Sequence, residues 1–202
     1  MSLMLHLRDS TMSHHKAAES HPFQAAMARG MLSRESFTTY LAQLMRVHAS
    51  LGSALVSCSE VSIASGARDD RAADARADLA FLGFAPDDVP VLPATADLVR
   101  DIENSNPFRL LGMHYVLEGS KNGSRYIARP VRKALGLSGL EGTRYMDPDG
   151  DDQKPKWEAF KAWADSLSLG QDQTAEVVAG ACAMFDAIRA ISDDVAGRTV
   201  GA

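Results

Sequence analysis

Apolar residues recur at helical spacing along most of the chain, and this period constrains the fold more than any other feature. After Ser33 the apolar and aromatic positions fall three or four residues apart, at Phe37, Tyr40, Leu41, Leu44, Val47, Leu51 and Leu55. This spacing places them on one helix face, which must be buried against other elements. The final long segment repeats the pattern at Val177, Cys182, Phe185, Ile188 and Ile191.

Shorter helices are predicted between these two segments. The Ala-rich stretch from Asp69 opens with aspartates and stops at Gly83, a residue type favoured just past a helix end. The stretch after Pro90 gives a short helix that must end near Asn106, before Pro107. Runs of alternating Val, Ile and Thr, which would indicate a sheet, are absent from the sequence. The sequence therefore predicts a single all-α domain over residues 1–202, with seven to nine helices.

Composition narrows the function classes. The chain has 202 residues, 46% hydrophobic and 23% charged, with 21 Lys and Arg against 26 Asp and Glu. A net charge of -5 argues against a nucleic-acid binder. Cys58 and Cys182 are expected to stay reduced, and no apolar run approaches the ~18 residues of a membrane span. We expect a soluble, cytoplasmic protein, whose opening Met-Ser-Leu is typical of an expression remnant.

The main irregular region is "YMDPDGDDQKPK", from Tyr145 to Lys156. Its four aspartates raise the possibility of a calcium loop, but the acid spacing and the terminal Glu of an EF-hand are missing. A solvated loop is the favoured interpretation.

Two histidines stand side by side in the first helix-like segment, where successive side chains are rotated by about 100°. With Leu7 as reference on a helical wheel, Thr11 and His14 fall within about 40° of it, and His15 lies about 80° round. Periodicity alone would bury His14 and leave His15 at the margin. Glu19, one turn beyond His15, can hold the second ring nitrogen of that histidine, as carboxylates do for ligand histidines.

A second informative stretch is "YVLEGSKNGSRYIARPVRKAL", from Tyr115 to Leu135. Gly119 and Gly123 sit four apart in an otherwise helical pattern, and each costs roughly 1 kcal/mol against alanine. Their shared face is bare backbone, which another helix or a flat ligand can approach closely. Pro130 removes the hydrogen bond to the carbonyl of Tyr126 and predicts a bend.

Together the two stretches resemble the heme oxygenase family. The spacing L-x-x-x-T-x-x-x-H-x-x-x-E at Leu7, Thr11, His15 and Glu19 is similar to the family's proximal helix. "YVLEGS" is similar to the distal helix of the bacterial, biliverdin-producing members. The resemblance implies that His15 is the axial heme ligand, that His14 packs, and that heme lies between the proximal and a kinked distal helix.

The resemblance also implies a catalytic set on the distal helix: Gly119, Ser120, Asn122 and Gly123. Many members carry an aspartate just after the first distal glycine, where it organises water. Here that position is Ser120, and Asn122, Ser124 and Arg125 are alternatives for holding water. Heme binding is therefore a firmer expectation than oxygenase activity.

Heme b is implied as both cofactor and substrate, cleaved with O2 and external electrons to biliverdin, carbon monoxide and ferrous iron. Further residues expected to support heme are Arg8, Thr11, Glu19, His114, Arg125 and Lys161, among which Arg8, His114 and Lys161 match positions near the propionates. Ferredoxin or a flavin reductase is the expected electron donor, and a bilin acceptor protein is a further expected partner. The basic residues Arg125, Arg129, Arg132 and Lys133 form a helical stripe, read either as a solvated face or as a ferredoxin docking site.

Two rival functions stay open. The first is a heme-binding or heme-transfer protein without turnover, motivated by Ser120. The second is a thiaminase-like enzyme of similar helical architecture, which would want an active-site cysteine. Neither Cys58 nor Cys182 lies in an acid-bearing motif. The remaining histidines, His48 among them, and the residues Trp157 and Trp163 are read as packing residues.

Overall fold

The computed structural model describes residues 2–58, 60 and 71–199, and these contain eight α-helices and no strand. The helices are α1 (Leu3–Glu19), α2 (Pro22–Ala28), α3 (Arg34–Val56), α5 (Arg71–Phe81), α6 (Pro93–Glu103), α7 (Pro107–Leu135), α8 (Gln153–Ser166) and α9 (Gln171–Thr199). Three short 3-10 turns are η1 (Pro86–Asp88), η2 (Arg144–Met146) and η3 (Gly150–Asp152). The all-α prediction is confirmed.

Local sequence sets the helix ends. The Ser33 hydroxyl accepts the N–H of Ser36 at 3.0 Å and begins α3 where the periodic pattern predicts. Asn106 caps α7 by accepting the N–H groups of two residues in its first turn, and Pro107 occupies the first helical position. Because Asn106 serves α7, the preceding helix α6 ends three residues earlier than its predicted limit, at Glu103.

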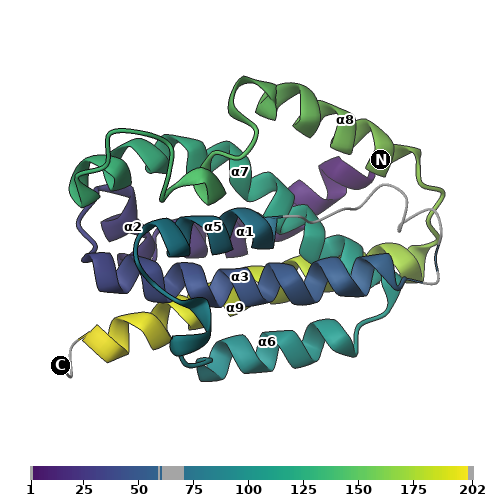
Figure 1. The fold of residues 1–202 in the computed structure, drawn as a ribbon. Coiled ribbons are helices and arrows are strands. Elements are labelled where there is room, and N and C mark those ends of the chain that lie inside the picture. Colours follow the sequence, from purple (N-terminus) through teal and green to yellow (C-terminus); the bar gives the residue numbers. More distant parts are fainter. Residues whose placement is uncertain (1, 59, 61–70, 200–202) are drawn as a thin grey trace.

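The helices pack around α7 and α9, which form the most extensive pairing, and around α3, which packs on α5 and α6. In Figure 1, α3 crosses the middle of the molecule, with α6 on one side and α8 on the other. The α1 helix, which carries the two adjacent histidines, packs along α9. This arrangement brings the N-terminal histidines and the glycines of α7 to the same region.

The core is built from the predicted apolar positions of α3 and α9 together with residues of the other helices. Its largest fully buried apolar side chains are Leu7, Leu41, Leu51, Leu55, Leu79, Ile102, Leu111, Met113, Met184 and Ile191. His48 is also fully buried, as the sequence predicts for a core histidine. Ser2 caps α1, and Leu3 packs against the core, so the second and third residues of the sequence are part of the first helix and its cap.

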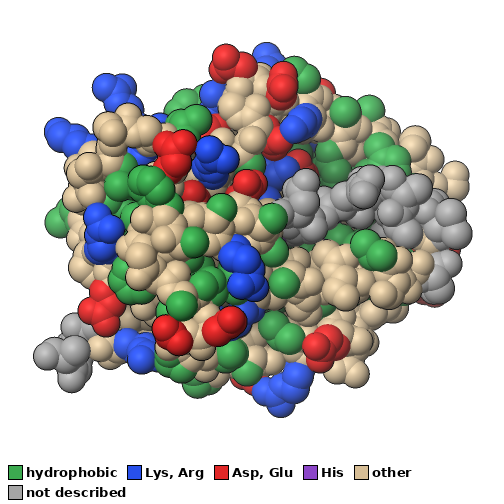
Figure 2. Space-filling view, viewed as in Figure 1, with side chains coloured by type: hydrophobic (Ala, Val, Ile, Leu, Met, Phe, Trp, Pro, Cys, Tyr) green, Lys and Arg blue, Asp and Glu red, His purple; other side chains and the backbone are tan. Residues whose placement is uncertain are grey.

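The surface carries both signs of charge. On the face shown in Figure 2, acidic and basic side chains are interspersed, and no large area of that face is of one sign. Within the described residues, no helix combines the length and the apolar character needed to cross a bilayer.

Candidate functional site

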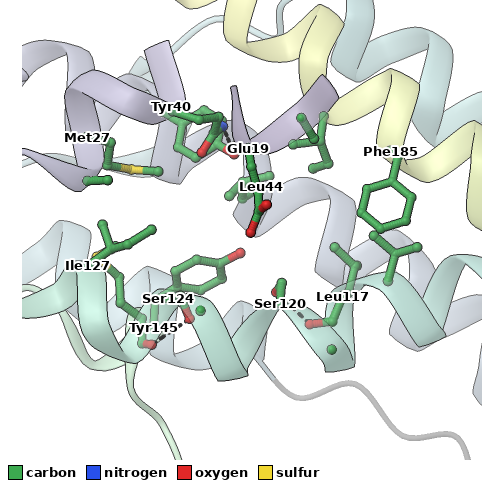
Figure 3. A pocket seen from close by; sticks show the side chains of 18 of the residues that line it. Glu19, Met27, Tyr40, Leu44, Leu117, Ser120, Ser124, Ile127, Tyr145 and Phe185 are labelled. Atoms are coloured by element: carbon green, nitrogen blue, oxygen red, sulfur yellow. Dashed lines mark hydrogen bonds between the residues drawn. The ribbon is translucent and has the colours of Figure 1, made fainter. Parts of the chain in front are cut away.

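A pocket of about 520 Å³ is lined by residues of α1, α2, α3, α7, α9 and η2, with one further residue each from α5 and α8. Its volume falls within the ~300–1,000 Å³ typical of small-molecule sites. Most of the side chains that line it are apolar, including Met27, Leu44, Leu117, Ile127 and Phe185. Figure 3 shows Glu19, Tyr40 and Met27 on one side of this pocket and Ile127, Ser124 and Ser120 of α7 on the other.

The two adjacent histidines contact different parts of the molecule. His14 turns toward α9, where its Nδ1 lies 3.0 Å from Oδ1 of Asp186. His15 lines the pocket, and its ring meets Phe185 edge-on with 5.5 Å between the ring centroids. The His15 Nδ1 lies 3.5 Å from a carboxylate oxygen of Glu19, which also lines the pocket. The carboxylate thus faces one ring nitrogen of His15, and the other nitrogen, Nε2, is the atom available to a metal in the pocket.

The wall opposite Glu19 contains the glycines of α7. A Cβ atom added at Gly123 would meet nothing within 4 Å, so the backbone there borders open space. A Cβ atom at Gly119 would meet the Trp157 ring at 3.4 Å, an ordinary contact distance. Neither glycine is a site of close helix packing. The geometry favours the second of the two interpretations, that a flat ligand approaches bare backbone at this wall.

Arg71 is a buried residue that the sequence analysis did not identify, and it forms hydrogen bonds to several polar groups at the pocket. The Arg71 side chain donates to the carbonyl oxygen of Leu117 at 3.1 Å, to the Ser120 hydroxyl at 3.0 Å and to the carbonyl oxygen of Tyr145 at 2.8 Å. Its guanidinium also lies over the Tyr145 ring, 4.0 Å from the centroid. Arg71 itself lines the pocket and is only 2% exposed.

The prediction of a solvated loop from Tyr145 to Lys156 is wrong for its first two residues, Tyr145 and Met146. Both are buried and line the pocket. The Asp78 carboxylate accepts the backbone N–H of Tyr145 at 2.8 Å, and Arg71 bonds the carbonyl of the same residue, so the segment is fixed at both its donor and its acceptor. Burial raises the pKa of Asp78, partly offset by backbone N–H groups, foremost that of Tyr145.

Tyrosine hydroxyls add further polar groups to the same pocket. The Tyr145 hydroxyl lies 3.0 Å from Nε2 of His48, on α3. Gln24 donates from Nε2 to the Tyr40 hydroxyl at 2.8 Å, and both residues line the pocket. Burial, reinforced by the negative charge of ionised Tyr145, raises the pKa of Tyr40 well above its usual value. These tyrosines and their partners belong to no sequence motif. Only the folded structure shows that they lie close together.

Six of the predicted site residues are not among the residues that line the pocket: Arg8, Thr11, His114, Asn122, Arg125 and Lys161. Thr11 is buried next to the site on α1 and donates from its hydroxyl to the Leu7 carbonyl. His114 is buried against the Phe160 ring. Asn122 donates to the carbonyl oxygen of Gly119, three residues earlier in α7, at 3.1 Å.

The three predicted cations pair with neighbouring acids. Arg8 bonds the carboxylate of Asp9, and Lys161 lies 2.9 Å from that of Glu158. Arg125 lies 3.6 Å from Asp151, on the polypeptide that follows α7. Within the basic stripe, Arg132 donates to the hydroxyl of Thr143 at 3.3 Å, whereas the side chains of Arg129 and Lys133 are exposed.

The residues present fit a flat, iron-bearing ring. Such a ligand needs a nitrogen donor on one side, a wall without side chains on the other, and an apolar girdle around its edge. His15 would provide the first and the open backbone at Gly123 the second, and Leu44, Ile127 and Phe185 would contribute to the third.

Comparisons with known proteins agree with this geometry. The heme oxygenase family model matches residues 1–194. A heme oxygenase from Xanthomonas campestris pv. campestris (strain 8004) is 33% identical over 110 residues, which are 54% of this chain and 59% of that relative. The match therefore spans less than two thirds of the relative's length.

Solved structures share the fold over nearly the whole chain. Heme oxygenase from Leptospira interrogans has a TM-score of 0.85 and 26% identity, covering 95% of this chain and 98% of its own. Heme oxygenase-2 from Synechocystis sp. PCC 6803, in complex with heme and NO, has a TM-score of 0.91 and 23% identity, covering 100% and 88%. A TenA homologue from P. horikoshii OT3 is less similar, with a TM-score of 0.62 and 14% identity, covering 96% and 98%. Because the family model covers all but the last eight of the 202 residues, this chain belongs to the heme oxygenase family.

Proposed function

We propose that this chain is a biliverdin-producing heme oxygenase, which cleaves heme b with O2 and external electrons to biliverdin, carbon monoxide and ferrous iron. One observation carries the proposal: His15 and the bare backbone at Gly123 border the same apolar pocket in a member of this family. When bound, heme supplies the redox-active iron and is itself the molecule that is oxidised.

Each residue of the pocket has a task in this proposal. His15 binds the iron through Nε2, and Glu19 orients the ring and selects its tautomer from Nδ1. A neutral histidine holds iron without the electron push of a thiolate, which favours O–O cleavage in other enzymes. Gly123 and Gly119 let the distal backbone come close to the ring face. Leu44, Leu117 and Phe185 keep bulk water away from the reacting edge.

The test is to add hemin and then a reductant while recording the absorption spectrum. We expect a one-to-one complex with a Soret band, which falls under air and reductant as a bilin band grows at longer wavelength and carbon monoxide is released. A stable complex that yields no bilin would identify a heme-binding or heme-transfer protein instead. That rival is motivated by Ser120, which stands where many relatives carry an aspartate. Failure to bind hemin would reject both.

The thiaminase-like alternative finds no support in the pocket. Cys58 and Cys182 are both described by the structure, and neither lines it. The Cys58 thiol lies 3.8 Å from the Glu60 carbonyl, and burial raises the pKa of the Cys182 thiol, which lowers its nucleophilicity at neutral pH. The likeness to the TenA homologue extends to the fold alone.

Partners and location belong to the same proposal. O2 and an electron donor, either ferredoxin or a flavin reductase, are required by the reaction, and a cytoplasmic location suits a protein that depends on such donors. A bilin acceptor protein would remove the product. Arg129 and Lys133 are the exposed cations of the α7 stripe and are the residues we assign to donor docking.

A further inference from the structure

We propose that Lys121 is a positioning residue for the pocket wall: its ion pair with Asp149 holds the glycine-bearing part of α7 in place and so controls how fast a ligand leaves the pocket. The inference rests on the proposed function in so far as the ligand is heme. The holding contact itself belongs to the heme-free protein and can be tested without any ligand.

The part of α7 that borders the pocket has little core packing of its own. Residues 119–127 are all described by the structure, and Lys121 is the only one of them that is buried. The buried positions of the helix resume at Ala128. The same stretch contains Gly119 and Gly123, a residue type that gives the backbone more freedom than any other. This turn of the helix therefore needs another source of support.

Polar side chains of this stretch bond to the segment that follows η2 and leads into α8, residues 146–153, which we call the strap. The Ser124 hydroxyl donates to the carbonyl oxygen of Met146 at 2.6 Å. Gln153, at the other end of the strap, donates from Nε2 to the side-chain oxygen of Asn122 at 3.3 Å. The strap is thus joined to this part of α7 at both of its ends.

Lys121 forms the most buried ion pair between α7 and the strap. Its Nζ lies 3.1 Å from a carboxylate oxygen of Asp149 and 2.8 Å from one of Glu118. The three side chains are 8–11% exposed, so water screens their charges little. Lys156 also pairs with Asp149, but its side chain is 56% exposed. Loss of one partner from a buried pair leaves the other charge buried, which costs far more than loss of an exposed pair.

The strap and the pocket lie on different sides of this turn of α7. Lys121 and Gly123 are two positions apart, which places them about 160° apart around the helix axis. Gly123 borders the open space of the pocket, whereas Lys121 reaches Asp149 and does not line the pocket. Lys121 therefore supports the wall from the side that a ligand does not occupy. Its loss should free the wall to move without removing any group that touches the ligand.

Hydrogen exchange of the heme-free protein tests the holding contact. Lys121→Met removes the charge and keeps a long, unbranched side chain. We expect the amides of residues 120–127 to exchange at least about tenfold faster, because opening of this turn no longer has to break a buried ion pair. The matched control is Lys154→Met, which removes an exposed lysine of α8 and should leave these rates within about twofold of the wild type.

Ile102→Val distinguishes local opening from a general loss of stability. It removes one carbon from a fully buried residue of α6, a helix that packs on α3 and α9, and so lowers the stability of the whole domain. The amides of residues 120–127 should keep their wild-type rates in this variant. Equal acceleration in Ile102→Val and Lys121→Met would show that Lys121 acts only through global stability and would overturn the inference. Unchanged exchange in Lys121→Met would overturn it as well.

The rate of heme loss tests the consequence for the ligand. Heme is transferred from each variant to an excess of apomyoglobin, which traps it, and the transfer is followed by the absorption spectrum. We expect about tenfold faster loss from Lys121→Met and no more than about a twofold change in Ile102→Val and Lys154→Met, because local opening governs release. Faster hydrogen exchange with unchanged heme loss would contradict the proposal, since the wall would then be held without controlling the ligand.

Asp149→Asn repeats both measurements from the strap and covers the case in which Lys121→Met does not fold. It removes the charge of the carboxylate at nearly constant shape and alters no residue of α7. We expect faster exchange of residues 120–127 and faster heme loss, and wild-type rates in a folded Asp149→Asn would contradict the inference. A wild-type protein that does not bind hemin would instead reject the proposed function, whereas the hydrogen-exchange comparison would still decide whether the pair holds the wall.

Discussion

Gly112 of α7 lies so close to the Val177 carbonyl of α9 that a Cβ atom on Gly112 would overlap it. A Cβ atom on Gly180 of α9 would overlap the carbonyl of Arg109 in the same way. The close crossing of α7 and α9 thus depends on these two glycines and not on the pair at Gly119 and Gly123. The glycines of α7 are divided between a packing role, one turn into the helix, and a role in the pocket wall.

This division predicts opposite effects for two substitutions in one helix. Gly112→Ala should lower the free energy of unfolding by at least the ~1–3 kcal/mol typical of overpacking, because backbone on both sides must move. Gly123→Leu should leave that free energy within about 1 kcal/mol of the wild type but weaken heme binding, because its side chain enters the pocket. Urea unfolding of the heme-free protein and hemin titration measure the two effects. Tight heme binding by Gly123→Leu would mean that the ring does not approach this backbone.

Asp149 makes acid stability depend on one buried ion-pair cluster. Its side chain is 8% exposed and pairs with Lys156 and, at 3.1 Å, with Lys121. Burial by itself raises the pKa of Asp149, but the bond to Lys156 and the charge of Lys121 outweigh it and leave the pKa lowered. A carboxyl whose folded pKa lies below its unfolded value stabilises the fold above the unfolded pKa, near 4, and loses this contribution as the pH falls through the folded pKa.

Asp149→Asn should therefore destabilise the protein at pH 7 by about 1–3 kcal/mol, and the difference from the wild type should shrink below about pH 4. Urea unfolding at pH 7 and pH 3.5 measures both quantities. The control is Asp151→Asn, whose fully exposed carboxylate lies 3.6 Å from Arg125 and should change the free energy of unfolding much less than Asp149→Asn does. A difference between Asp149→Asn and the wild type that is the same at both pH values would show that the carboxylate charge is not what stabilises the segment.

The exposed cations of α7 predict a specific effect on electron delivery. Charge reversal at Arg129 and Lys133 should slow ferredoxin-driven turnover and abolish its salt dependence, because steering by charge acts mainly on the association rate. Turnover with ascorbate should change little. Arg132 is left intact because its bond to Thr143 gives it a structural contact. The matched control reverses Arg76 of α5 and Arg100 of α6, which are also exposed. Equal slowing by both pairs, or with every reductant, would argue against docking at α7.

The fold could be predicted well from the sequence because helical period and capping are local signals. Ser33 and Gly83 marked helix ends, and the wheel placed Leu7 and Thr11 on the buried face of α1. The site was predicted only in part. His15, Glu19 and Gly123 belong to motifs within single helices, and the structure places them at one pocket, although their roles stay predictions.

Motifs within single helices could not identify the hydrogen-bonded group formed by Arg71, His48 and Tyr145. They come from three separate segments, and each looks ordinary in its own sequence context: a cation at a helix start, a core histidine and a tyrosine before an acidic loop. Only tertiary packing brings the Tyr145 hydroxyl to His48, 97 positions away. Arg8 and Lys161, which the resemblance places near the propionates, do not line the pocket, and each pairs with an acid close to it in the sequence. Their role towards the propionates stays a prediction.

The role of His15 as the iron ligand of an active enzyme is tested most directly by replacing it with glycine. His15→Gly removes the imidazole while leaving α1 capped and packed, and free imidazole can then occupy the vacated space. We expect His15→Gly to lose bilin and carbon monoxide production and to regain a substantial part of both with millimolar imidazole. His14→Gly places the same glycine one position earlier in α1 and loses the contact to Asp186, but it should remain active without imidazole. Full activity of His15→Gly without imidazole, or an imidazole requirement in His14→Gly, would contradict the account.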